Sequence, residues 1–219
     1  MHMAQYPSFS RTEYPLLYNV LMVTVGIDEV GRGCWAGPLV AGAVILPPNF
    51  HLEDGPLDGG LQLRDSKKLS KSQREKLAKI VHAEAIAVGL GWVWPEAIDS
   101  GGITAAVKSA MQQALAAITG DYDEIIVDGN INYFVDDPRS RAVIKADDLF
   151  PSVSAASIVA KVARDNYMAE IAEQYPGYGF EQHVGYGTAL HIASLNDLGV
   201  TDIHRKSYKP IRAILGAAA

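Results

Sequence analysis

The chain has 219 residues, of which 48% are hydrophobic and 20% are charged, and its formal net charge is −6. This composition is typical of a globular protein with one well-buried core, and the negative charge argues against a blanket electrostatic attraction to nucleic acid while leaving room for local basic patches. The single cysteine, Cys34, excludes an internal disulfide and fits a reducing compartment, which predicts a cytoplasmic protein with a buried thiol. The apolar stretch 16–27 is interrupted by polar residues and lacks a basic leader, so we expect no membrane span and no signal peptide.

The hydrophobic pattern predicts short strands and helices after a poorly ordered N-terminal segment, residues 1–19. In chain order we expect strands at 20–27 and 39–46, a helix from Ser72, a strand at 85–94, a helix at 103–118, strands at 124–127 and 142–145, helices at 153–175 and 189–198, and a basic tail at 204–212. Three strands followed by alternating helices and strands are typical of an α/β fold with a mixed sheet flanked by helices. We expect residues 20–212 to form a single domain and 213–219 to form a tail.

Three of the predicted strands end in acidic residues. Asp28 and Glu29 follow the first strand, Asp128 follows the fourth and Asp147 follows the fifth. Two carboxylates ~4 Å apart repel each other by ~4 kcal/mol at an effective dielectric of ~20, and a divalent cation reverses that sign. Carboxylate oxygens are the ligands that Mg²⁺ and Mn²⁺ prefer, whereas no histidine or cysteine stands at the spacing of a zinc site. A single such acid is usually a turn residue or a helix cap, but the repetition favours a metal site.

A glycine-rich turn, Gly31-Arg32-Gly33, follows the first acidic pair. Glycine lets a backbone approach a nucleic acid closely, although a plain turn between two strands has the same pattern. Residues 31–36 also fit the dinucleotide-binding pattern GxGxxA, which requires a helix immediately afterwards. Pro38 and the β-branched residues after it exclude that helix, and we therefore reject the dinucleotide interpretation.

Several sequence blocks resemble the signatures of ribonuclease HII, the type 2 ribonuclease H. They are residues 26–33 (GIDEVGRG), 65–69 (DSKKL), 127–130 (VDGN), 145–147 (KAD), 154–165 and 178–188. The blocks stand in the family's order and cover about residues 23–212. The resemblance implies a ribonuclease H-like fold with a C-terminal helical region that binds substrate. It also implies an endonuclease that hydrolyses the RNA strand of RNA–DNA hybrids and nicks 5′ of single ribonucleotides in duplex DNA, with a role in ribonucleotide and primer removal.

The resemblance further implies which residues are catalytic. Asp28, Glu29, Asp128 and Asp147 match the family's four catalytic carboxylates. By two-metal chemistry they would hold two Mg²⁺ or Mn²⁺ ions, and the products would carry 3′-hydroxyl and 5′-phosphate ends. One departure is Ala146, where many bacterial members have glycine. Asp148 is adjacent, so the choice of Asp147 rests on the motif.

Substrate contacts are implied in the same way. In the family, the tripeptide matched by Gly31, Arg32 and Gly33 reads the 2′-hydroxyl at the cleavage junction, and Tyr186 matches the tyrosine that senses the substrate. Lys67 is a candidate phosphate contact, and Asn130 either orients a phosphate or caps a turn. Further candidate phosphate contacts, each also compatible with a solvated surface charge, are Lys68, Lys71, Arg74, Arg205, Lys206, Lys209 and Arg212. Lys161 and Asp165, four residues apart, are expected to form a helical ion pair.

Two other interpretations compete with this one. A non-catalytic nucleic-acid-binding module would keep the fold and lack metal-dependent cleavage. The sister type of ribonuclease H carries an additional N-terminal substrate-binding domain, for which about twenty residues before the first strand leave no room. The tail after Ile211 carries no convincing motif for binding a sliding clamp, so we expect a monomer without an obligate protein partner.

Overall fold

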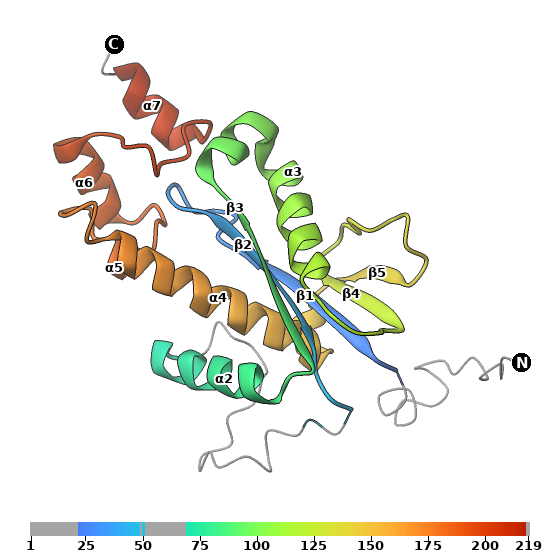
Figure 1. Cartoon of the computed structure of the whole chain (residues 1–219). Helices are drawn as coiled ribbons and strands as arrows, with labels where there is room; N and C mark the ends of the chain where they lie inside the picture. The colour runs from blue at the N-terminus through green and yellow to red at the C-terminus, as the bar shows by residue number, and fades with distance from the viewer. Residues whose placement is uncertain (1–21, 49, 51–68, 218–219) are drawn as a thin grey trace, which may run out of the picture.

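The structure is a computed structural model and describes residues 22–48, 50 and 69–217. Within these residues a five-stranded sheet has the order β3-β2-β1-β4-β5 (Figure 1). The strands are β1 (Thr24–Val30), β2 (Leu39–Ile45), β3 (Ala87–Val93), β4 (Glu124–Asp128) and β5 (Ser140–Val143). β1 pairs antiparallel with β2 and parallel with β4, so the sheet changes direction at its central strand. The expected mixed sheet is therefore confirmed.

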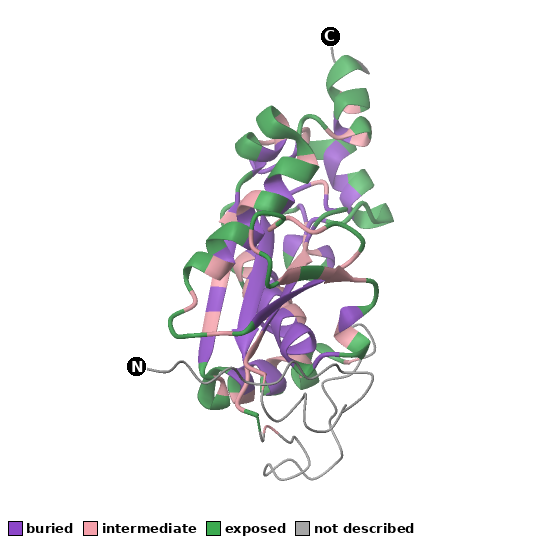
Figure 2. Cartoon of the chain, turned by 90° about the vertical axis from the view of Figure 1, so that its right-hand side faces the viewer, coloured by how far each residue is buried: buried purple, intermediate pink, exposed green. Residues whose placement is uncertain are grey.

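Helices cover both faces of this sheet (Figure 1). They are α2 (Lys71–Glu84), α3 (Pro95–Ala116), α4 (Pro151–Ile171), α5 (Phe180–His183), α6 (Ala189–Leu198) and α7 (Lys209–Ala217), with a short 3₁₀ helix η3 (Ala146–Asp148). α3 packs on one face in a core with β1, β2 and β4, whereas α2 and α4 pack on the other face. Buried residues are concentrated along the strands (Figure 2). None of the described helices is long and apolar enough to cross a lipid bilayer.

Two glycines let α4 lie directly against the sheet. A Cβ at Gly26 would stand 2.2 Å from the main-chain carbon of Ser152, and a Cβ at Gly42 would stand 2.5 Å from the carbonyl oxygen of Ala156. Both positions exclude any larger residue, because real side chains do not approach a backbone so closely. The consequence is functional, since the next turn of α4 carries Ser157 to the carboxylate of Asp28.

Several predicted boundaries were wrong for identifiable reasons. α3 begins at Pro95, eight residues earlier than predicted, and a break at Gly102 (φ 77°) separates its first turns from the regular helix. α4 begins at Pro151, where the fixed φ of proline suits the first helical position, and not at a serine cap. β5 ends at Val143, because Lys145 adopts a left-handed conformation (φ 57°) that redirects the chain into η3. Residues 209–217, where no helix was predicted, form α7.

The C-terminal elements gather beyond one end of the sheet, next to the turn that joins β1 to β2 (Figure 1). The contact is made by main-chain hydrogen bonds: Trp35 N–H donates to Gly185 O at 2.8 Å, and Arg205 N–H donates to Trp35 O at 2.7 Å. Their apolar residues form a core of their own with Ala36, Phe180 and Ile211. The segment 177–208 is thereby fixed against residues 31–38.

Candidate active site

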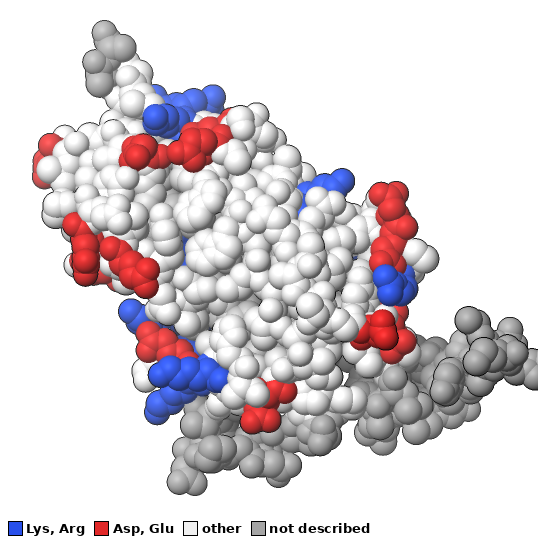
Figure 3. Space-filling view, viewed as in Figure 1, with Lys and Arg blue, Asp and Glu red and all other residues white. Residues whose placement is uncertain are grey.

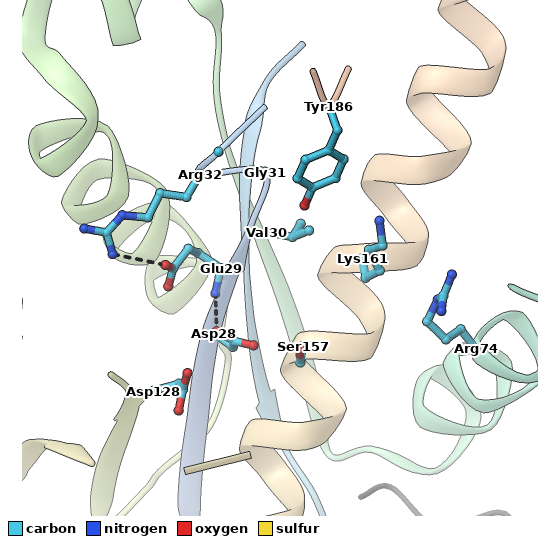
Figure 4. Close-up of a pocket in the computed structure, with 11 residues that line it drawn as sticks. Asp28, Glu29, Val30, Gly31, Arg32, Arg74, Asp128, Ser157, Lys161 and Tyr186 are labelled. Atoms are coloured by element: carbon cyan, nitrogen blue, oxygen red, sulfur yellow. Dashed lines mark hydrogen bonds and ion pairs between the residues drawn. The ribbon is translucent and has the colours of Figure 1, made fainter. Parts of the chain in front are cut away.

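A pocket of about 430 Å³ opens where β1 and β4 end beside α4 (Figure 4). Acidic, basic and small residues share its wall. The lining residues are Asp28, Glu29, Val30, Gly31, Arg32, Gly33, Arg74, Asp128, Ser157, Lys161 and Tyr186. Seven of the sequence-predicted site residues are thus in one place: three of the four carboxylates, the glycine-rich turn Gly31, Arg32 and Gly33, and Tyr186.

Asp28 and Asp128 are brought together by strand pairing. Ile27 stands opposite Val127 in the parallel ladder. The next residue of each strand, Asp28 or Asp128, therefore lies at the same end of the sheet. Oδ1 of Asp28 accepts the N–H of Glu29, and Oδ1 of Asp128 accepts the N–H of Ala146, each at 2.7 Å. Burial raises the pKa of Asp28 to about 7, and the charges of Glu29 and Asp128 raise it as well, while a hydrogen bond from Ser157 lowers it. The folded protein therefore disfavours a negative charge on Asp28, chiefly because that carboxyl group is buried.

Asp147 lies on η3, close to Asp128 in space but outside the wall of the pocket. It follows Ala146, whose N–H holds Asp128, and its side chain is half-buried. It is not among the described residues that line the pocket. The structure thus brings Asp28, Glu29 and Asp128 together and keeps Asp147 beside them.

A divalent cation fits the chemistry of these donors. Buried, mutually repelling carboxylates are the oxygen ligands that hard cations prefer, and a cation removes the repulsion that raises the pKa of Asp28. In the described part of the chain, no three Asp, Glu, His or Cys side chains are already arranged as a metal site.

The cationic side chains that line the pocket form ion pairs with Asp or Glu side chains. Arg32 Nη1 lies 3.7 Å from Glu29 Oε1, at the exposed rim. Lys161 Nζ lies 2.8 Å from Asp165 Oδ1, which confirms the predicted helical ion pair, and Arg74 lies 4.0 Å from the other oxygen of Asp165.

Sequence reasoning assigned Ser157 and Lys161 no place in the site. Both line the pocket, and Ser157 donates a hydrogen bond to Asp28. Their spacing with Asp165 was the available signal, because residues 157, 161 and 165 are four apart and share one face of a helix.

Tyr186 closes the opposite side of the pocket, where Lys161 Nζ lies 5.7 Å from its ring centroid. Tyr186 is 39% exposed. Burial of its hydroxyl raises the pKa of Tyr186 to about 12, and a hydrogen bond to Cys34 raises it too. Cys34 is fully buried, as predicted.

Other candidate contacts divide into three groups. Arg205 is fully buried, so its interpretation as a phosphate contact was wrong: a lysine- and arginine-rich segment does not reveal which of its members faces inward. Asn130 is exposed and does not line the pocket, and Lys206, Lys209 and Arg212 are exposed as well. Lys67 and Lys68 lie outside the described residues.

Comparisons with known proteins show which family the chain resembles. The family described as Ribonuclease HII matches residues 25–211. The ribonuclease HII of Dichelobacter nodosus is 44% identical over 190 residues, which are 87% of this chain and 96% of that protein. Among solved structures, the ribonuclease H2 of Pyrococcus horikoshii superposes with a TM-score of 0.75 at 26% identity, covering 90% of this chain and 98% of that one.

A second solved structure is a complex of ribonuclease HII with PCNA from Archaeoglobus fulgidus. Its TM-score is 0.67 at 26% identity, and the match covers 86% of this chain and 96% of that chain. These likenesses extend over the sheet, the pocket and the C-terminal helices. The chain therefore belongs to the ribonuclease HII family and is a metal-dependent endoribonuclease that cuts the RNA strand of RNA–DNA hybrids.

Proposed function

We propose that the protein also nicks duplex DNA 5′ of a single embedded ribonucleotide, and that Asp28, Glu29, Asp128 and Asp147 hold two Mg²⁺ or Mn²⁺ ions for this reaction. The observation that supports the proposal is a single pocket in which three of these carboxylates, the glycine-rich turn and Tyr186 meet. When bound, the cations would supply activation of the attacking water and stabilisation of the leaving oxygen, giving 3′-hydroxyl and 5′-phosphate ends. The biological role would be removal of ribonucleotides and primers from DNA.

The carboxylates are prepared for this role by the main chain. Amide N–H groups fix one oxygen of Asp28 and one of Asp128, so the orientation of each carboxylate is set before substrate arrives. Arg32 does the same for Glu29 through their ion pair. Asp147 would join from η3, next to the residue that holds Asp128.

The two glycines of the turn would serve different purposes. Gly31 has a φ of 89°, and a Cβ there would collide with Arg164 Nε at 2.4 Å, so the protein's own packing requires glycine. At Gly33 an added Cβ would meet nothing within 4 Å, and the residue is not in the left-handed region. Gly33 therefore leaves room for another molecule, and we assign that room to the ribose whose 2′-hydroxyl marks the cleavage junction.

Tyr186 would pack its ring against the sugar or base at that junction, since a half-exposed ring is free to stack. Lys161 and Arg74, both held by Asp165, would contact phosphates. Lys and Arg side chains lie over α2 on the face shown in Figure 3, with acidic side chains among them. We retain Lys67 and Asn130 as proposed substrate contacts.

We further propose that the protein is a cytoplasmic monomer whose only obligate partner is its substrate. The complex with PCNA in Archaeoglobus fulgidus makes a sliding clamp the partner to test against this proposal. Light scattering of the isolated protein, alone and with a clamp, separates the two cases.

A nicking assay tests the proposed reaction. The substrate is a DNA duplex with one ribonucleotide, with an all-DNA duplex of the same sequence as control, and each is incubated with Mg²⁺ or Mn²⁺. We expect one nick 5′ of the ribonucleotide, with a 3′-hydroxyl that a polymerase can extend, and no cleavage after Asp128→Asn. Cleavage of a long hybrid without nicking of this duplex would refute the proposal, and full activity of Asp128→Asn would refute the site.

A further inference from the structure

The turn between β1 and β2 is held from inside the protein by two fully buried arginines, Arg164 and Arg205. Arg164 of α4 donates to Pro38 O at 2.8 Å and to Ala36 O at 3.1 Å. Arg205, which precedes α7, donates from Nε to Gly37 O at 3.0 Å. Within the described residues neither arginine forms an ion pair with a carboxylate. Both guanidinium groups instead bind main-chain carbonyls of residues 31–38 or of their neighbours.

The carbonyl of Arg32 receives two of these hydrogen bonds. Arg205 Nη1 donates to it at 3.2 Å and Tyr208 Oη donates to it at 2.6 Å. Arg205 Nη1 also donates to Tyr208 Oη at 3.0 Å, and the guanidinium carbon lies 5.3 Å from the centroid of the Tyr208 ring. The three groups form a closed arrangement around one carbonyl oxygen of the glycine-rich turn.

Burying the guanidinium group of Arg205 is unfavourable, because the group loses its hydration. Burial lowers the pKa of Arg205, and its Nη2 is buried without a hydrogen-bond partner. A buried cation without an anion is poor at stabilising a fold, since apolar residues of similar volume fill such a space at lower cost. The contacts of Arg205 therefore indicate that it serves to orient the glycine-rich turn.

The geometry of the peptide group between Arg32 and Gly33 indicates how this orientation affects the pocket. The carbonyl of Arg32 and the N–H of Gly33 belong to one planar trans peptide group, so they point in opposite directions. Holding the carbonyl inward, toward Arg205 and Tyr208, turns the N–H of Gly33 outward, on the side where Gly33 lines the pocket. No described main-chain carbonyl accepts this N–H.

We propose that Arg205 and Tyr208 are positioning residues for ribonucleotide recognition, which hold the Arg32 carbonyl so that the N–H of Gly33 is aimed at the ribose hydroxyl of the substrate. This proposal rests on the proposed function of the glycine-rich turn. It places two residues of the C-terminal segment behind the wall of the pocket, where they act on the substrate only through the turn.

The test measures discrimination, which a purely structural role would not change. Dissociation constants are measured by fluorescence anisotropy for a duplex with one ribonucleotide and for the matching all-DNA duplex, in an Asp128→Asn background that prevents cleavage. Tyr208→Phe removes only the hydroxyl that donates to Arg32. Tyr175→Phe is the matched control, because it removes a hydroxyl that donates to Asp202 at 2.5 Å in the same C-terminal region.

We expect Tyr208→Phe to reduce the ratio of the two dissociation constants by about two- to tenfold, the range for one hydrogen bond, while Tyr175→Phe leaves the ratio unchanged. Arg205→Lys keeps the charge but loses the planar fork, and it should reduce the ratio at least as much. In the cleavage-competent enzyme, Tyr208→Phe should lower kcat/KM for the ribonucleotide duplex by a similar factor at temperatures where the variant is fully folded.

Failure of this proposal and failure of the proposed function give different results. If the parent binds both duplexes equally, the turn does not read the ribonucleotide and the proposed function is wrong on that point. If the parent discriminates and Tyr208→Phe discriminates equally well, Arg205 and Tyr208 are not positioning residues. Should Arg205→Lys fail to fold, Tyr208→Phe alone decides, because its ring and packing are retained.

Discussion

Asp28 and Asp128 lie side by side near the C-terminal ends of β1 and β4 (Figure 4). One oxygen of each accepts a main-chain N–H, from Glu29 and Ala146 respectively. The proximity of the two carboxylates follows from the parallel pairing of Ile27 with Val127. The burial of Asp28 and the repulsion within this group raise the pKa of Asp28 to about 7. The metal-free protein is thus destabilised at the place where we propose that it holds its cations.

Replacing Asp28 should stabilise the metal-free protein at alkaline pH. A pKa near 7 in the folded state, against an ordinary 3.8, means that the folded protein binds the proton more tightly than the unfolded chain. The free energy of unfolding therefore falls as pH rises from about 4 to 7, by up to roughly 4 kcal/mol, and then levels off. In urea unfolding with EDTA, Asp28→Asn should be more stable than the parent at pH 8, and the difference should shrink at pH 5.

Exposed Asp136 offers the control for this measurement. Asp136→Asn should keep the pH profile of the parent. Saturating Mg²⁺ should stabilise the parent at pH 8 more than it stabilises Asp28→Asn. Equal stability of the parent and Asp28→Asn at both pH values would contradict our account of the carboxylates.

Substitution of the two glycines of the turn should separate folding from activity. Gly31→Ala forces a methyl group against Arg164 in a left-handed conformation, and we expect a loss of about 1–3 kcal/mol of stability. Gly33→Ala meets no protein atom within 4 Å, so its stability should change by no more than about 0.5 kcal/mol. Its methyl group occupies the room assigned to the ribose, so kcat/KM for the ribonucleotide duplex should fall about tenfold or more. Parental activity of Gly33→Ala would exclude close approach of substrate there.

Lys161 should contribute a phosphate contact. If it does, Lys161→Met weakens binding of any duplex and lowers the slope of log Kd against log salt by about 1. Lys79 is exposed on α2 outside the pocket, so Lys79→Met serves as the control with an unchanged slope. Equal slopes for both variants would leave Lys161 as a partner of Asp165 only.

The strand-and-acid pattern was sufficient to predict the centre of this site. The sequence predicted short apolar strands before Asp28 and Asp128, whose acids would meet if the strands are neighbours, and the ladder shows that these strands pair. Asp147 was expected at a strand end in the same way. That prediction failed locally, because Lys145 adopts a left-handed conformation, which its residue type gives no reason to expect.

The C-terminal segment was the least predictable part. Its basic residues indicated a solvated surface, yet Arg205 is buried beneath the turn that it supports. Charge patterns report composition and cannot distinguish a buried cation that binds carbonyls from one that binds phosphate. The same limit applies to His191 and His204, which are fully buried although nothing in their spacing indicates a pair.

The three buried histidines of this region support Tyr186. Thr201 N–H donates to His204 Nδ1 at 3.0 Å, which leaves the proton of neutral His204 on Nε2. That proton is shared with His191 Nε2 at 3.1 Å, and Nδ1–H of His191 then donates to the carbonyl of Tyr186 at 3.0 Å. His183 accepts the N–H of Gly185 at 3.2 Å. A second proton on the pair would set two N–H groups against each other.

Acid should therefore destabilise this region. Burial lowers the pKa of His191 and of His204 to about 4, below the ordinary 6.5. The unfolded chain takes up these protons first, so the free energy of unfolding falls as pH drops from about 6.5 to 4, by roughly 3 kcal/mol per imidazole. Asp28 has the opposite pH dependence in the same range, so urea unfolding is best measured in the Asp28→Asn background.

Two variants test this pH dependence of the free energy of unfolding. His204→Phe keeps a ring beside Phe180 and should reduce the dependence, whereas His82→Gln, at an exposed position on α2, should retain it. Identical profiles for both variants would show that the pair does not titrate as its hydrogen bonds require.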